Sequence, residues 1–163
     1  MAHGEAYRAA EKKIEEAWQL GATELHLEAM GLTELPESLG QLTQLQSLDL
    51  SDNQLTTLPE SLGQLTHLQE LELFMNQLSE LPDSLAQLSQ LMRLSLSGNK
   101  FVSLPECVCA MGNLTELYVI ENQIESLPAT MSKLTRLKAL ALGGSNISRN
   151  YAYLEGVYGN KLC

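Results

Sequence analysis

The chain has 163 residues, of which 44% are apolar and only 5% aromatic, so it can form one domain with a core built mainly of leucine. No run approaches the roughly 18 apolar residues of a membrane span, so a membrane protein is not expected. The net charge of −10 argues against nucleic acid and anionic membranes as partners, because both carry negative phosphates.

The first predicted element is a helix over residues 5–20, EAYRAAEKKIEEAWQL. Gly21 follows it as a natural stop signal. We expect this helix, within a segment of residues 1–21, to cap the apolar end of the structure that follows; a separate docking role is the alternative. Its apolar residues form one stripe at helical spacing: Tyr7, Ala10, Ile14, Ala17 and Trp18.

A pattern of 23 residues then repeats along most of the chain. Leu48 and Leu50 lie two residues apart and should point to one face of a strand. The leucines after Pro59 are spaced by three and four, which permits a helical or 3₁₀ segment that returns the chain. One copy cannot bury its own leucines, so the copies should stack into a solenoid with a parallel sheet along one side. Intact copies begin at Leu45, Leu68, Leu91 and Leu114, with an imperfect copy before them from Ala22 and a broken one after them from Leu137.

One polar residue type keeps a fixed place in the intact copies. A side-chain amide both donates and accepts, so a stacked column of asparagines can satisfy backbone groups where each strand turns away. We therefore predict a structural role for this column, which consists of Asn53, Asn76, Asn99 and Asn122 and ends at Met30 and Ser145.

The pattern L-x-x-L-x-L-x-x-N-x-L-x-x-L-P resembles that of leucine-rich repeat proteins. The period and the segments LPESLGQL and LPDSLAQL are similar to the intracellular and bacterial type, as in Roco proteins, Ras-associated leucine-rich repeat proteins and bacterial effectors. The resemblance covers about residues 22–147 and implies an α/β horseshoe with a concave parallel sheet of about six strands. It also implies a protein-binding module, without naming a partner, because the family binds many unrelated proteins.

The repeat ends after Leu142, where the leucine–proline pair is missing. We expect residues 148–163 to form an improvised cap over the last coil; they could equally begin a further domain. The residues available for such a cap are Tyr151, Tyr153, Leu154, Val157 and Tyr158.

The sequence gives little sign of catalysis. No P-loop, dinucleotide glycine pattern or recognisable catalytic triad occurs, so we expect neither an enzyme nor a cofactor. His26 lies beside Glu24 and Glu28, where a metal site is conceivable but not expected.

The cysteines are interpreted as structural. Cys107 and Cys109 replace small residues of the other copies, and a zinc site would need two further ligands nearby. With Cys163 the cysteine count is odd, and the N-terminus has no signal-peptide run. Both features favour reduced thiols in the cytoplasm, while secretion without a cleaved signal stays open.

Residues that flank the strand leucines should point outward and be free for binding. Phe74 and Met75 are large and apolar where other copies carry Ser51-Asp52 and Ser97-Gly98. An apolar centre inside a polar rim is typical of protein interfaces. We predict an apolar patch of Phe74, Met75, Met92, Tyr118 and Ile120, with a charged rim of Asp49, Asp52, Glu70, Glu72, Arg93 and Glu116.

The charge is uneven along the chain. Residues 1–81 carry 14 acidic and 3 basic residues, a net of −11, whereas residues 82–163 carry 6 and 7, a net of +1. The acidic half favours a protein partner with a basic patch, although solubility alone is an equal explanation. We expect a monomer that binds its partner through the concave sheet. The alternatives are a self-association module or the recognition part of a longer signalling or effector protein.

Overall fold

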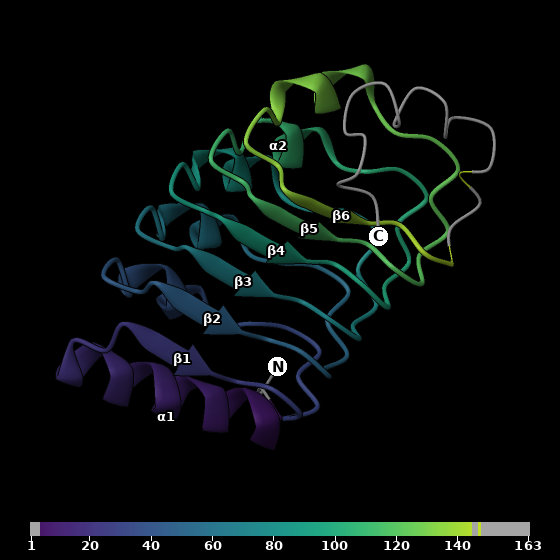
Figure 1. The fold of residues 1–163 in the computed structure, drawn as a ribbon. Helices are drawn as coiled ribbons and strands as arrows, with labels where there is room; N and C mark the ends of the chain where they lie inside the picture. Colours follow the sequence, from purple (N-terminus) through teal and green to yellow (C-terminus); the bar gives the residue numbers. More distant parts are fainter. Residues whose placement is uncertain (1–3, 145–146, 148–163) are drawn as a thin grey trace.

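The computed structural model describes residues 4–144 and residue 147. Its centre is one sheet of six parallel strands that stack in chain order, β1 to β6 (Figure 1). Neighbouring strands pair residues that lie one 23-residue period apart, as Leu25 pairs with Leu48. The predicted α/β solenoid is therefore confirmed. The strands are β1 (Glu24–His26), β2 (Ser47–Asp49), β3 (Glu70–Glu72), β4 (Arg93–Ser95), β5 (Glu116–Tyr118) and β6 (Ala139–Ala141).

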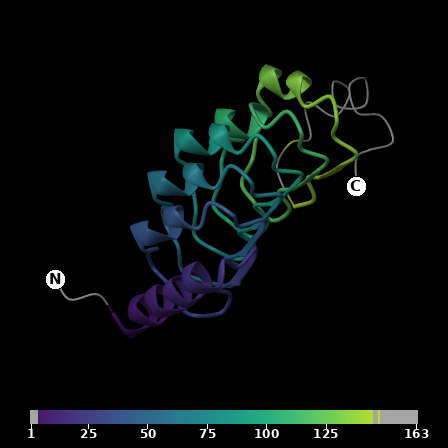
Figure 2. The ribbon, with the colours of Figure 1, turned by 90° about the vertical axis from the view of Figure 1, so that its left-hand side faces the viewer.

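A short helical segment returns the chain after each proline that follows the strands. These segments stack in one row away from the strands (Figure 2). Most are 3₁₀ helices, as the spacing of the leucines predicts, but the segment with the cysteines is a turn of α-helix. The row consists of η1 (Glu37–Gln41), η2 (Glu60–Gln64), η3 (Asp83–Gln87), α2 (Glu106–Cys109) and η4 (Ala129–Lys133).

Helix α1 (Glu5–Leu20) packs against β1 and η1 at the N-terminal end of the stack (Figure 1). It buries Ala10, Ile14 and Ala17, and Gly21 ends it in the left-handed conformation. Trp18 is 56% exposed, so its place in the predicted buried stripe was wrong. Trp18 lies about 40° around the helix axis from Ile14 but about 100° from Ala17, so it stands at the edge of the buried face.

The predicted asparagine column is confirmed as a ladder of hydrogen bonds between repeats. The Asn76 side-chain oxygen accepts the Leu55 N–H at 3.0 Å. Its nitrogen donates to the Leu50 carbonyl at 3.0 Å and to the Leu73 carbonyl at 3.3 Å. Each amide thus joins two repeats where the backbone leaves the sheet, so these groups stay paired inside the core.

No helix within the described ranges is both long and apolar enough to cross a membrane. The expected C-terminal cap of residues 148–163 lies outside the described residues, as does Ser145 of the asparagine column.

Candidate functional site

The outward side chains follow from the alternation along each strand. In β3, Leu71 is buried, while Glu70 and Glu72 point to the concave side. The alternation continues past the strand end, so Leu73 is buried and Phe74 is 44% exposed. Two strands further along the sheet, Ile120 takes the same place in its repeat and is 37% exposed.

A hollow of about 280 Å³ lies between these two side chains. Phe74, Tyr118 and Ile120 line it, and the small buried residues Ser95, at the end of β4, and Ser97, two residues after it, lie between them. The serines leave space that a larger residue would fill, and the Ser97 hydroxyl accepts the Ile120 N–H at 3.0 Å. We call this the concave hollow; its lining is completed by Arg93 and Glu121.

The structure does not bring all five residues of the predicted apolar patch together. Met92 precedes β4, at the opposite end of the strands from Phe74, and lines a second hollow. Met75 is exposed but does not line the concave hollow. The second hollow is lined by Gln69, Gln90, Met92, Asn113, Thr115 and Arg136.

Met75 has a specific relation to the next repeat. Its φ is 54°, in the left-handed region, where Gly98 stands in the following copy. A Cβ on Gly98 would meet the Met75 sulfur at 2.8 Å, so the Met75 side chain lies over this glycine. The absence of a side chain at Gly98 is thus what makes room for Met75.

Arg93, predicted as a rim residue, links three strands. Its Nε lies 3.0 Å from a Glu72 oxygen on β3 and 3.8 Å from a Glu116 oxygen on β5. Its guanidinium lies 5.5 Å from the centre of the Tyr118 ring, a cation–π arrangement. The Tyr118 hydroxyl donates to Glu116 at 2.8 Å. Arg93 therefore fixes one wall of the concave hollow, a role that the sequence did not indicate.

Glu72, one of the predicted acidic rim residues, is partly buried on the sheet next to Arg93. Burial raises the pKa of Glu72, and the negative charges of Asp49 and Glu70 raise it further, while Arg93 and Ser95 act in the opposite direction. The net direction is upward, so the ionised form of Glu72 is less favourable here than in water.

We expect Glu72→Gln to stabilise the fold slightly at neutral pH, by about 0.5 kcal/mol or less. A raised carboxyl pKa means that the folded state binds the proton more tightly than the unfolded state. The ionised carboxylate therefore costs stability at neutral pH, and this cost disappears as the pH falls below the usual range of glutamate. Melting curves of both proteins at pH 7 and pH 4 check this. A variant that is less stable at pH 7 would contradict it and assign the larger effect to the Arg93 ion pair.

The two described cysteines are buried in α2, in agreement with a structural role. Burial is the main cause that raises the pKa of both thiols, that of Cys107 to about 11. A thiol with a raised pKa is a poor nucleophile, because the thiolate is the reactive form.

Iodoacetamide should modify Cys107 in the folded protein much more slowly than in urea at pH 8. Raising the pKa from 9.0 to about 11 makes the thiolate roughly a hundredfold scarcer at this pH, and burial restricts access further. The rate in the folded protein should rise as the pH approaches 11. Peptide mass spectrometry measures each cysteine separately, with the same residue in urea as the comparison. Rapid modification of folded Cys107 at pH 8 would contradict its burial.

Family models match most of the chain. A model described as "Leucine-rich repeat region" matches residues 61–154, and one described as "Leucine rich repeat" matches residues 21–78. The curated proteins contain no match to this chain.

Solved structures are also similar. A leucine-rich repeat protein of Leptospira interrogans is 34% identical, with a TM-score of 0.69 over 80% of this chain and 40% of that one. YopM of Yersinia enterocolitica is 31% identical, with a TM-score of 0.73 over 89% and 30% of the two chains. The plant peptide hormone receptor RGFR1, in complex with RGF2, is 31% identical, with a TM-score of 0.61 over 69% and 19%. This chain therefore spans less than half the length of each of these proteins.

Proposed function

This chain belongs to the leucine-rich repeat family, and we propose that it is a non-enzymatic recognition module that binds a partner protein through the concave face of its sheet. The observation that carries this proposal is the concave hollow, where Phe74 and Ile120 expose apolar surface that the core does not require. The solenoid tolerates Ser51 in the column of Phe74, so the larger side chain has no structural necessity there.

The surroundings of the concave hollow suit a protein interface. Apolar side chains lie at its centre, and Arg93, Glu116 and Glu121 lie around them. Hot-spot residues of interfaces are enriched in aromatic residues and arginine, and a polar rim commonly surrounds them. Tyr118 and Arg93 already hold each other in place, so binding would cost little side-chain entropy at these two residues.

A basic segment is the partner chemistry that fits this face. Asp49, Glu70 and Glu72 lie on β2 and β3, towards the acidic N-terminal half of the chain. Complementary charge accelerates encounter and disfavours acidic partners, and its effect falls with salt. We therefore propose a partner that presents an apolar side chain to the concave hollow next to lysine or arginine residues.

Capture from a lysate of the source cells tests this function with matched bait proteins. The test variant is Phe74→Ser and the control is Val102→Ser, because Val102 is exposed but does not line the concave hollow. A binding partner should be retained by the wild type and by Val102→Ser and lost with Phe74→Ser. Its retention should also weaken as salt increases. Equal capture by all three baits would place binding outside the concave hollow.

A further inference from the structure

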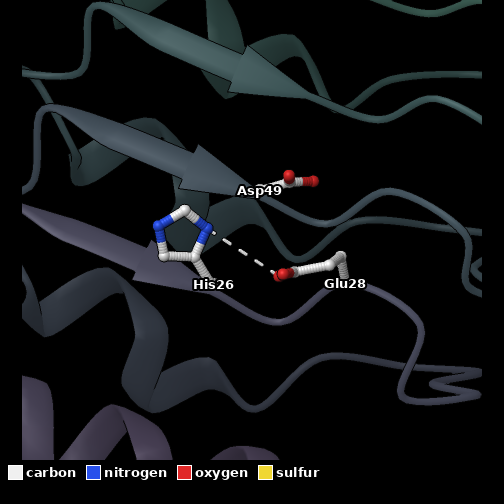
Figure 3. A group of neighbouring side chains, drawn as sticks. All are labelled: His26, Glu28 and Asp49. Atoms are coloured by element: carbon white, nitrogen blue, oxygen red, sulfur yellow. Dashed lines mark ion pairs between the residues drawn. The ribbon is translucent and has the colours of Figure 1, made fainter.

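Three side chains of types that can ligate a metal ion lie close together on the concave side of β1 and β2 (Figure 3). Neither of these strands lines the concave hollow. His26 and Glu28 come from β1 and the residues after it, and Asp49 comes from β2, directly opposite His26 in the sheet register. One ligand atom from each residue lies within 4.8 Å of the others. His26 Nδ1 lies 3.8 Å from a Glu28 oxygen.

From this geometry we infer a binding site for a divalent transition-metal ion, with Zn²⁺ as the best match, formed by His26, Glu28 and Asp49. Zinc accepts imidazole nitrogen and carboxylate oxygen together, at about 2.0–2.2 Å. In a tetrahedral site, two ligand atoms at these bond lengths lie about 3.4 Å apart. The side chains therefore have to approach one another by up to about 1.4 Å, which a change of side-chain rotamer on the fixed sheet can supply.

The backbone beneath the site is well anchored. One Asp49 oxygen accepts the Ser51 N–H at 2.9 Å, which orients the carboxylate and leaves its second oxygen free for the ion. The Lys13 ammonium donates to the His26 carbonyl at 2.9 Å and thereby ties β1 to helix α1. The hydrogen bond to Asp49 supports a ligand side chain directly, and supporting bonds of this kind strengthen metal binding.

The ligand chemistry also selects the ion. Calcium takes six to eight oxygen ligands, and magnesium needs near-ideal octahedral oxygen geometry, so neither suits a site with one imidazole and two carboxylates. Imidazole favours zinc and its neighbours in the first transition row. Three protein ligands leave at least one position of a tetrahedral ion open, and this position faces the concave side, where water or a ligand from another molecule can occupy it.

Equilibrium dialysis of the full chain against Zn²⁺, followed by metal quantification, tests the site. The test variants are His26→Gln and Asp49→Asn. The control variants are His67→Gln, an exposed histidine whose ring bonds the Thr43 carbonyl, and His3→Gln, which removes the histidine nearest the amino terminus. Loss of even a supporting residue weakens metal sites by about 10–100-fold. Each test variant should therefore bind Zn²⁺ at least about tenfold more weakly, while both controls keep the wild-type affinity.

Other results would overturn the inference. Unchanged Zn²⁺ binding in His26→Gln would exclude the site, as would the absence of saturable binding in the wild type. Equal losses in His26→Gln and His67→Gln would indicate non-specific binding to histidine. Tighter binding of Ca²⁺ than of Zn²⁺ would contradict the ligand chemistry. Circular dichroism of each variant shows that any loss does not come from unfolding.

Discussion

Deletion of residues 1–20 should cause aggregation or a large loss of stability. Helix α1 covers the N-terminal end of the stack, where it buries Ala10, Ile14 and Ala17 against the first repeat. Burial of Ile14 alone is worth about 1.5–3 kcal/mol. Without α1 the edge of β1 would also lie open to pairing with another chain, which is a common route to aggregation.

Size-exclusion chromatography and thermal melting of the truncated chain measure this effect. If the truncated chain is insoluble, the variant Ile14→Ala is a milder test of the same contact. It should lower the free energy of unfolding by about 2–5 kcal/mol, as truncations of buried isoleucine do. Trp18→Ala is the matched control, because Trp18 lies on the same helix but is largely exposed. A truncated protein that remains monomeric with unchanged melting would refute the capping role.

The period of the sequence was sufficient to predict the strands, the return segments and the asparagine ladder. In a stacked repeat, each residue contacts its own equivalents one period away, so the pattern of one copy specifies the packing of the next. Leu48 therefore pairs with Leu25 and with Leu71 without any information beyond the spacing.

The details of the concave face depend on features that the period does not contain. The sequence grouped Met75 and Met92 with Phe74, but Met92 precedes its strand and Met75 lies over Gly98. The position of Met92 depends on where its strand begins, and that of Met75 depends on its left-handed backbone conformation. An alignment of the repeats shows neither feature. The central role of Arg93 depends likewise on one rotamer that reaches acids on both neighbouring strands.

The metal-ligating cluster illustrates the same limit. The sequence placed Glu24 and Glu28 beside His26, whereas the structure brings Asp49 to His26 and Glu28. The signal was available, since Asp49 lies 23 residues after His26, one period along the same outward column. Contacts between repeats, together with neighbours within one repeat, decide which side chains meet on this sheet.

Phe74→Ser should weaken partner binding by about tenfold or more while leaving the fold intact. Truncating an aromatic anchor can cost more than about 2 kcal/mol of binding free energy, and about 1.4 kcal/mol corresponds to a factor of ten. The fold should tolerate serine because Ser51 and Ser97 occupy this column in the neighbouring copies. The main-chain role of residue 74, where its carbonyl accepts the Asp52 N–H at 2.8 Å, does not depend on the side chain.

The matched control is Leu73→Ser, one residue earlier on the same segment. Leu73 is fully buried, so this change removes core packing and should cost about 2–5 kcal/mol of stability. Titration of the captured partner against Phe74→Ser, with melting curves of both variants, separates binding from folding. The expected result is weaker binding with normal melting for Phe74→Ser and early melting for Leu73→Ser. Unchanged affinity in Phe74→Ser would move the binding site away from the concave hollow, because Phe74 forms part of its apolar lining.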